Sequence, residues 1–225
     1  ALQHRQDWNV ADTMRLQMDQ YAIAWEEMRD VVLSAPAVDL DVGLALEILR
    51  GWDGRVLASS VPASVYELFL SEMTIRIARA KAPRSWRWIV GESLSPLSRH
   101  NFDCFRRTGH MVQLMRTQPP GWFPHPWTEE IALALGEAVR RLQSLHGPRT
   151  MAWTWGHMRP LVMYHPLTKS PGLVGKVLGK ILNLAPVPWG GDADVINQAA
   201  VLPLYPTDSP NNIASVRAVI DVGAW

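Results

Sequence analysis

Histidine and aspartate side chains gather in the last third of the chain, and side chains of these types can ligate a metal ion. His157 and His165 lie in one apolar stretch, and Asp192 and Asp194 follow a pair of glycines. Imidazole and carboxylate ligands suit several divalent ions. The spacing of the four residues matches no standard metal motif, however, and a Gly-Gly-Asp turn with hydrogen-bonded histidines explains them at least as well. We therefore assign no metal ligand.

A nucleophile–base pair could be formed by Cys104, the one cysteine of the chain, with one of the seven histidines. The sequence does not bring such a pair together, and a lone cysteine in a helix is usually a small buried hydrophobic residue. The chain contains no phosphate-binding loop and no GxGxxG, HExxH or GxSxG motif. We assign no catalytic or cofactor-binding residue and expect no cofactor.

Tryptophans offer a third kind of chemistry, because an exposed indole can stack on a sugar or another flat ligand. Trp122, Trp153 and Trp155 are the candidates, and a non-catalytic binding module with a tryptophan-lined surface is the alternative function that they suggest. Aromatic residues that alternate along a strand more often belong to the core.

Composition limits the classes of partner. Lys and Arg number 22 against 21 Asp and Glu, so the long-range positive field that draws nucleic acid or an anionic membrane is missing. No apolar run approaches the roughly 20 residues that cross a bilayer. A short amphipathic helix after Ser170-Pro171 carries Lys176 and Lys180 opposite its apolar side, and we interpret it as ordinary surface structure. We expect neither a nucleic-acid nor a membrane partner.

The elements that position these residues change character along the chain. Apolar residues at helical spacing predict helices over residues 9–34, 42–50, 60–82 and 128–147. The first of these carries one stripe, made of Met14, Met18, Tyr21, Trp25, Met28 and Val32. Alternating patterns then predict strands over residues 151–163, 195–202 and 214–222. The prediction is an α+β fold with a mainly helical part, 1–148, and a strand-rich part, 149–225, within one domain.

Several short motifs occur in a specific order. Trp153-Thr-Trp155-Gly-His157 is followed by His165-Pro-Leu, Gly190-Gly-Asp192, Val195-Ile-Asn197 and Ser215-Val-Arg217 with Val219-Ile-Asp221. Earlier come Leu16-Gln-Met-Asp19 and Trp52-Asp-Gly54. This ordered series resembles the C-terminal part of the penicillin acylase (penicillin amidase) family, and the resemblance covers nearly the whole chain.

The resemblance implies an N-terminal-nucleophile hydrolase with a four-layer αββα fold, to whose sandwich the strands predicted here would belong. In that family a precursor is cleaved into an α and a β subunit. A serine at the new β N-terminus attacks the amide of an acylated amine, for example a β-lactam or an acyl-homoserine lactone. Donors in an oxyanion hole stabilise the transition state. The parent protein would be a bacterial enzyme of the periplasm or a secreted one.

The sequence departs from the family pattern in lacking the catalytic residues. Ala1 has no nucleophilic side chain, and the family's nucleophile and oxyanion asparagine lie upstream of the helix that matches residues 9–34. We therefore expect a C-terminal piece of the β subunit that is inactive alone. Its partners would be the α subunit, the N-terminal part of the β subunit and a small acylated amide. Uncovered sheet edges would favour self-association of the piece. Arg217 and Asp221 would anchor one strand face through polar contacts.

Overall fold

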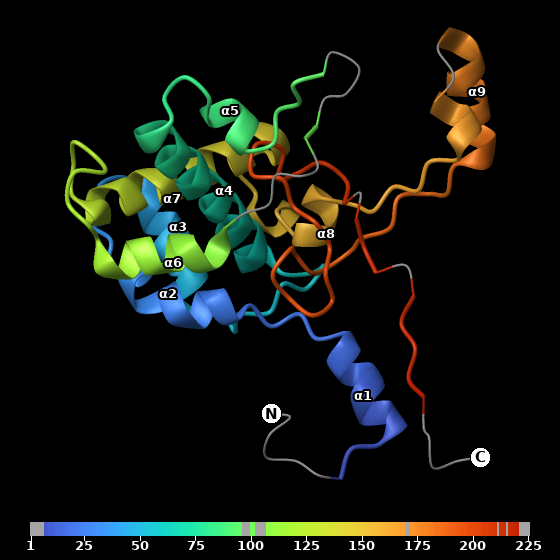
Figure 1. The fold of residues 1–225 in the computed structure, drawn as a ribbon, viewed down its shortest axis with the longest axis horizontal. Coiled ribbons are helices and arrows are strands. Elements are labelled where there is room, and N and C mark those ends of the chain that lie inside the picture. Colours follow the sequence, from blue (N-terminus) through green and yellow to red (C-terminus); the bar gives the residue numbers. More distant parts are fainter. Residues whose placement is uncertain are drawn as a thin grey trace.

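The computed structural model describes residues 7–95, 100–101, 107–169, 172–210, 212–214 and 216–220. Within them the chain forms mostly helices (Figure 1). The α-helices are α1 (Val10–Gln17), α2 (Ile23–Leu33), α3 (Leu40–Arg50), α4 (Val61–Lys81), α5 (Trp86–Ile89), α6 (Thr108–Thr117), α7 (Trp127–His146), α8 (Trp155–Met158) and α9 (Gly172–Leu182). Two short 3-10 helices are η1 (Thr150–Ala152) and η2 (Pro166–Lys169).

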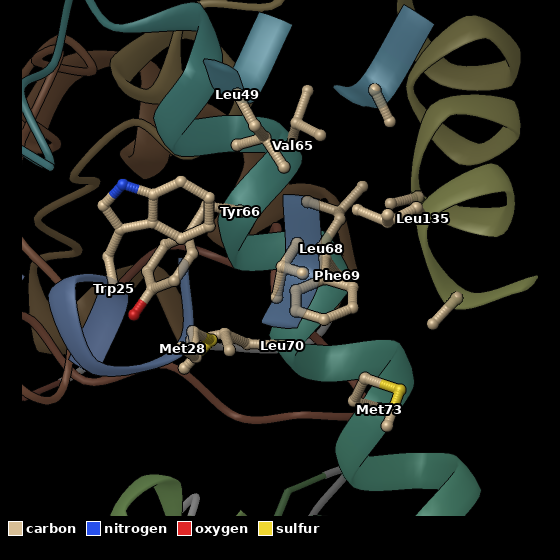
Figure 2. Packing of buried hydrophobic residues seen from close by; sticks show 14 of the residues in the cluster. Trp25, Met28, Leu49, Val65, Tyr66, Leu68, Phe69, Leu70, Met73 and Leu135 are labelled. Carbon is tan, nitrogen blue, oxygen red and sulfur yellow. The ribbon is translucent and has the colours of Figure 1, made fainter. Parts of the chain in front are cut away.

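Helix α4 is the centre of the hydrophobic core. Ser60 caps its N-terminus, with Oγ accepting a hydrogen bond from the backbone nitrogen of Ala63 at 3.2 Å, and Pro62 occupies its first turn. The helix is buried on nearly every side, as expected for a helix that is apolar all round. It packs against α3 and α7, which also pack against each other. Figure 2 shows side chains of α4 between Trp25 and Met28 of α2 and Leu135 of α7.

Three aromatic rings join α2, α4 and the turn after α3. The ring of Tyr66 lies 5.9 Å from that of Trp25 and 4.8 Å from that of Trp52, and the two indoles lie 5.2 Å apart. Such tilted and edge-to-face pairs add to the stabilisation from burial. Trp52 is therefore a core residue that connects its turn to the helices.

The single helix predicted over residues 9–34 is wrong, because the chain leaves helical geometry between α1 and α2. The backbone nitrogen of Ala22 donates to the carbonyl of Gly54 at 2.8 Å, and that of Val56 donates to the carbonyl of Gln20 at 2.9 Å. Backbone groups that an unbroken helix would pair internally are thus paired with a distant segment. Met14 and Met18 are consequently exposed, at 57% and 48%.

The strands predicted in the last third, and with them the α+β class and the sandwich strands assigned to this chain, are also wrong. Residues 151–163 form η1 and α8, and the described residues contain only isolated β-bridges, such as Leu161 with Val187 and Ala199 with Ile213. An alternating pattern produces a strand only where a neighbouring segment completes a hydrogen-bond ladder. Here the backbone nitrogens of Trp155 and Gly156 donate instead to Ser60 and Ala58 of a loop. The boundary at residue 148 stays a prediction.

The C-terminal segment 216–220 runs extended beside α1, away from the helical core (Figure 1). Gln17 Nε2 donates to the carbonyl of Ala218 at 3.0 Å. The alternation predicted for this segment is present, but its apolar side faces solvent, with Val216 78% and Ile220 76% exposed. Among the described helices none is long and apolar enough to span a membrane.

Candidate functional site

Four chain segments meet between α1 and the start of α4, and we call this meeting point the junction. Its segments are residues 19–22, 52–58, 155–156 and 189–197. The backbone nitrogen of Gly191 donates to the carbonyl of Val56 at 2.7 Å, and that of Asn197 donates to the carbonyl of Asp19 at 2.8 Å. Together with the bond from Val56 to Gln20, these contacts connect three of the segments. The fourth segment joins through Trp155.

The two glycines at positions 190 and 191 permit this close approach. A Cβ at Gly190 would lie 2.8 Å from the carbonyl oxygen of Val56 and equally close to the side chain of Gln20. Gly191 adopts a φ of +83°, and a Cβ there would lie 2.1 Å from the carbonyl oxygen of Asn197. Only glycine combines this backbone conformation with this packing.

Asp192 and Asp194 fold the loop that follows the glycines. Asp192 is fully buried, and its Oδ1 accepts hydrogen bonds from the backbone nitrogens of Asp194 at 2.7 Å and Val195 at 2.9 Å. Asp194 Oδ2 accepts a hydrogen bond from Thr108 Oγ1 at 2.7 Å, which connects the loop to the first residue of α6. Both carboxylates therefore have structural partners within the chain.

The metal hypothesis placed these aspartates together with His157 and His165. His157 lies in α8 with its ring 5.1 Å from that of His146. His165 lies beside η2, where its backbone nitrogen donates to Asn183 Oδ1 at 2.9 Å. Within the described residues no group of three or more His, Cys, Asp or Glu side chains is arranged to hold a metal ion. Cys104 lies outside the described residues.

The tryptophans proposed as stacking surfaces are mostly core residues. Trp155 is fully buried, and its Nε1 donates to the carbonyl of Gly191 at 2.9 Å. Trp153 is also fully buried, with Nε1 donating to the carbonyl of Gly147 at 2.9 Å. Trp122 is half-buried and lies under the ammonium of Lys81, 4.3 Å from the ring centre. Trp153 and Trp155 cannot stack on a ligand, so the predicted surface that includes them is wrong.

Charged side chains line the solvent side of the junction. Arg55 Nη1 donates to Asp19 Oδ1 at 3.0 Å, and Arg217 Nη2 donates to Asn197 Oδ1. Tyr21 donates its hydroxyl to Glu26 Oε2 at 3.1 Å, and burial, followed by this hydrogen bond, raises the pKa of Tyr21 above its ordinary value. These contacts fix the side chains in place.

Two open hollows flank α1 at this edge of the junction. One, of about 400 Å³, is lined by side chains that include Asp12, Arg15 and Arg55, with Arg15 paired to Asp12. The other, of about 420 Å³, lies between α1 and the segment that carries Arg217. The four segments of the junction carry carboxylates, a guanidinium group, amides, a phenol and indoles, but no serine, cysteine or threonine. The arrangement can position backbone and bind polar groups.

The model of the penicillin amidase family matches residues 1–225. The chain belongs to the penicillin amidase family. It is also similar to proteins described as acyl-homoserine lactone acylase QuiP. The Pseudomonas putida relative is 26% identical over 99% of the chain and 27% of the relative. The relative from Pseudomonas syringae pv. syringae is 29% identical over 66% of the chain and 18% of the relative. The chain thus spans about a quarter or less of the relatives that it matches.

Several of the motifs that carried the family resemblance are brought together by the structure, whereas His165-Pro-Leu lies apart, at the start of η2. Asp19, the Trp52–Gly54 turn, Gly190–Asp192, Asn197 and Arg217 all lie at or beside the junction. Sequence reasoning missed Gln20 and Arg55 as their partners. The position of Arg55, directly after the Trp-Asp-Gly turn, is the only sequence signal that could have suggested it.

Proposed function

We propose that this chain is a structural part of an amidohydrolase that cleaves the amide bond of an acylated amine. The observation that carries the proposal is the match of the family model over residues 1–225. The geometry of the junction supports it, because residues of separate family motifs make direct hydrogen bonds to one another.

The substrate that we propose is an N-acyl-homoserine lactone, in preference to a β-lactam. The support is that the curated relatives are acyl-homoserine lactone acylases by name, with 26–29% identity to this chain. The reaction would break the bond between the acyl carbon and the amide nitrogen, adding water to give a fatty acid and homoserine lactone.

The nucleophile in this proposal is an N-terminal serine on a segment outside these 225 residues, as the family resemblance implies. The four segments of the junction contain no serine, cysteine or threonine, which agrees with a positioning role for this chain. The remaining α-subunit and β-subunit segments would then be its partners. The junction would hold α1 and the loop 189–197 in one arrangement against the chain that carries the serine.

A chimera tests the proposal directly. Residues 1–225 would replace the matching segment of the Pseudomonas putida relative, and release of homoserine lactone from an N-acyl-homoserine lactone would be measured. We expect turnover by the chimera and none by the isolated chain on an acyl-anilide. A folded, processed chimera without amidase activity would contradict the proposal. If the chimera hydrolysed penicillin G and no N-acyl-homoserine lactone, the proposed amide hydrolysis would stand and the proposed substrate would be wrong.

A further inference from the structure

Helix α9 stands apart from the helical core on a long excursion of the chain (Figure 1). The excursion begins and ends at the bridge between Leu161 and Val187, where each backbone nitrogen donates to the other residue's carbonyl, at 2.8 and 3.0 Å. The described element against which α9 packs is η2, within the same excursion. The helix is thus presented at a distance from the rest of the described chain.

The apolar side of α9 is uncovered. The exposed fractions are 76% for Leu173, 62% for Val174 and 72% for Ile181, and Val177 and Leu182 are exposed as well. At 100° per residue these side chains occupy one half of the helix. The buried position of the helix is Gly175, which lies outside that half. The helix therefore leaves its apolar half to solvent.

The charge of this region is of one sign. No aspartate or glutamate occurs between Glu137 and Asp192, and the excursion carries Lys169, Lys176 and Lys180. Lys176 and Lys180 are exposed on the half of α9 that is not apolar. A second copy packed on α9 would bring more lysines to the same surface without an acidic partner from this region. An anionic lipid surface complements both halves, since it offers acyl chains to the apolar residues and phosphates to the lysines.

We propose that α9 is an interfacial anchor that lays its apolar half on an anionic lipid bilayer. The sequence led us to expect ordinary surface structure and no membrane partner, because a short helix with two lysines is common on protein surfaces. The structure leaves that side open and places the lysines beside it. The anchor lies in the plane of the surface and spans nothing.

Co-sedimentation with vesicles tests the proposal on the 225-residue chain. Vesicles of phosphatidylcholine with phosphatidylglycerol are compared with vesicles of phosphatidylcholine alone. We expect binding to the anionic vesicles that weakens as salt is raised, because salt screens the lysines. The double variant Lys176→Gln/Lys180→Gln should lower the partition coefficient about 30-fold. Val177→Asp/Ile181→Asp should lower it by at least about 100-fold.

Two matched controls separate this surface from general charge and hydrophobicity. Arg29→Gln/Arg50→Gln removes two exposed cations from the helical core. Val38→Asp/Leu40→Asp places two acids at positions that are 55% and 92% exposed at the start of α3. Neither control should change the partition coefficient more than about twofold. Their thermal melts, and those of the α9 variants, should match the parent chain, because all these side chains are exposed.

Several results would overturn the anchor. The chain could fail to bind anionic vesicles, or its binding could be lost equally in the control variants. A further result uses the folded chimera with the Pseudomonas putida relative, whether or not it is active. If the isolated chain binds vesicles and the chimera does not, other acylase segments cover α9. Self-association of the chain that Val177→Asp/Ile181→Asp abolishes, without vesicle binding, would assign the surface to a second copy.

Discussion

Gly191 and Asn197 approach so closely that a single added methyl group would fill the space between them. A Cβ on Gly191 would lie 2.1 Å from the carbonyl oxygen of Asn197, whose backbone nitrogen in turn donates to Asp19 at 2.8 Å. The glycine thus controls whether the loop 189–197 can reach the segment between α1 and α2.

Gly191→Ala should lower the free energy of unfolding by about 2–4 kcal/mol, because the new side chain meets both an unfavourable positive φ and a carbonyl oxygen. Urea denaturation of the 225-residue chain measures the change. Gly43→Ala is the matched control, since its added Cβ meets nothing within 4 Å in the first turn of α3. That control should stabilise the chain by up to about 1 kcal/mol. Equal effects of the two substitutions would contradict the junction packing.

Arg159→Met should destabilise the chain by about 2–4 kcal/mol. The guanidinium is only 1% exposed, and it donates to the carbonyls of Asp208, Ala199 and Ala200. Methionine fills similar space but leaves these carbonyls without their donor. Arg159→Lys should recover part of this loss, because the ammonium can still donate to a carbonyl. The recovery should be incomplete, because an ammonium cannot reproduce the planar fork of donors of a guanidinium. Arg149→Met, at an exposed position, should change the stability by less than about 0.5 kcal/mol.

The contact between His146 and His157 should make stability depend on pH. Burial, and then the charge of His157, lower the pKa of His146 below its ordinary value. The unfolded chain then binds the proton more readily than the folded chain, so stability rises with pH. The contribution of His146 to the free energy of unfolding is fully present above the pKa of about 6.5 that His146 has in the unfolded chain. It is lost as the pH falls through the lower pKa that His146 has in the folded chain.

Urea midpoints measured from pH 7.5 downward test this sign. The fall in the free energy of unfolding should be smaller in His146→Gln than in the parent chain. His157→Gln should give an intermediate slope, because it removes the charge of the neighbour and retains the burial of His146. A parent chain that becomes more stable on acidification through this range, or slopes that do not differ between parent and His146→Gln, would show that the histidine pair has no such role.

Arg217→Ala should lower the melting temperature of the whole acylase and leave the kcat of the folded enzyme nearly unchanged. The guanidinium of Arg217 donates to Asn197 Oδ1, and through Asn197 it supports the backbone contact with Asp19. The described partner of Arg217 is a side chain of the junction, so its loss should weaken the scaffold. Asn197→Ala should produce a similar loss, and the double variant should cost less than the sum of the two single ones. A selective loss of turnover in a stably folded variant would place Arg217 at the active site. Asp221, predicted as its companion, lies outside the described residues.

Much of the helical half follows from local pattern. The spans of α3, α4 and α7 follow from apolar periodicity between capping and breaking residues such as Asp39, Ser60 and Gly147, and the structure confirms these spans within a few residues. The motifs of the last third likewise indicated the family. Periodicity is sufficient there because a helix pairs its backbone groups within itself.

The break between α1 and α2 and the absence of strands from the described last third could not be predicted in this way. Residues 19–22 pair their backbone with Gly54, Val56 and Asn197, which are remote in sequence. Residues 216–220 keep their alternation but find no described neighbour with which to form a ladder. A strand or a helix break depends on which other segment supplies the hydrogen bonds, and no window of sequence contains that segment.

The sequence by itself determined the family, because the motifs containing Asp19, Trp52, Gly191, Asn197 and Arg217 can each be recognised within a short stretch of sequence. Only the tertiary structure decided that these motifs form one junction, that Trp153 and Trp155 are core residues, and that the apolar half of α9 is uncovered. The physical reason is that local pattern reports what a segment can bury or pair. Which groups it does bury or pair depends on contacts between segments far apart in the chain.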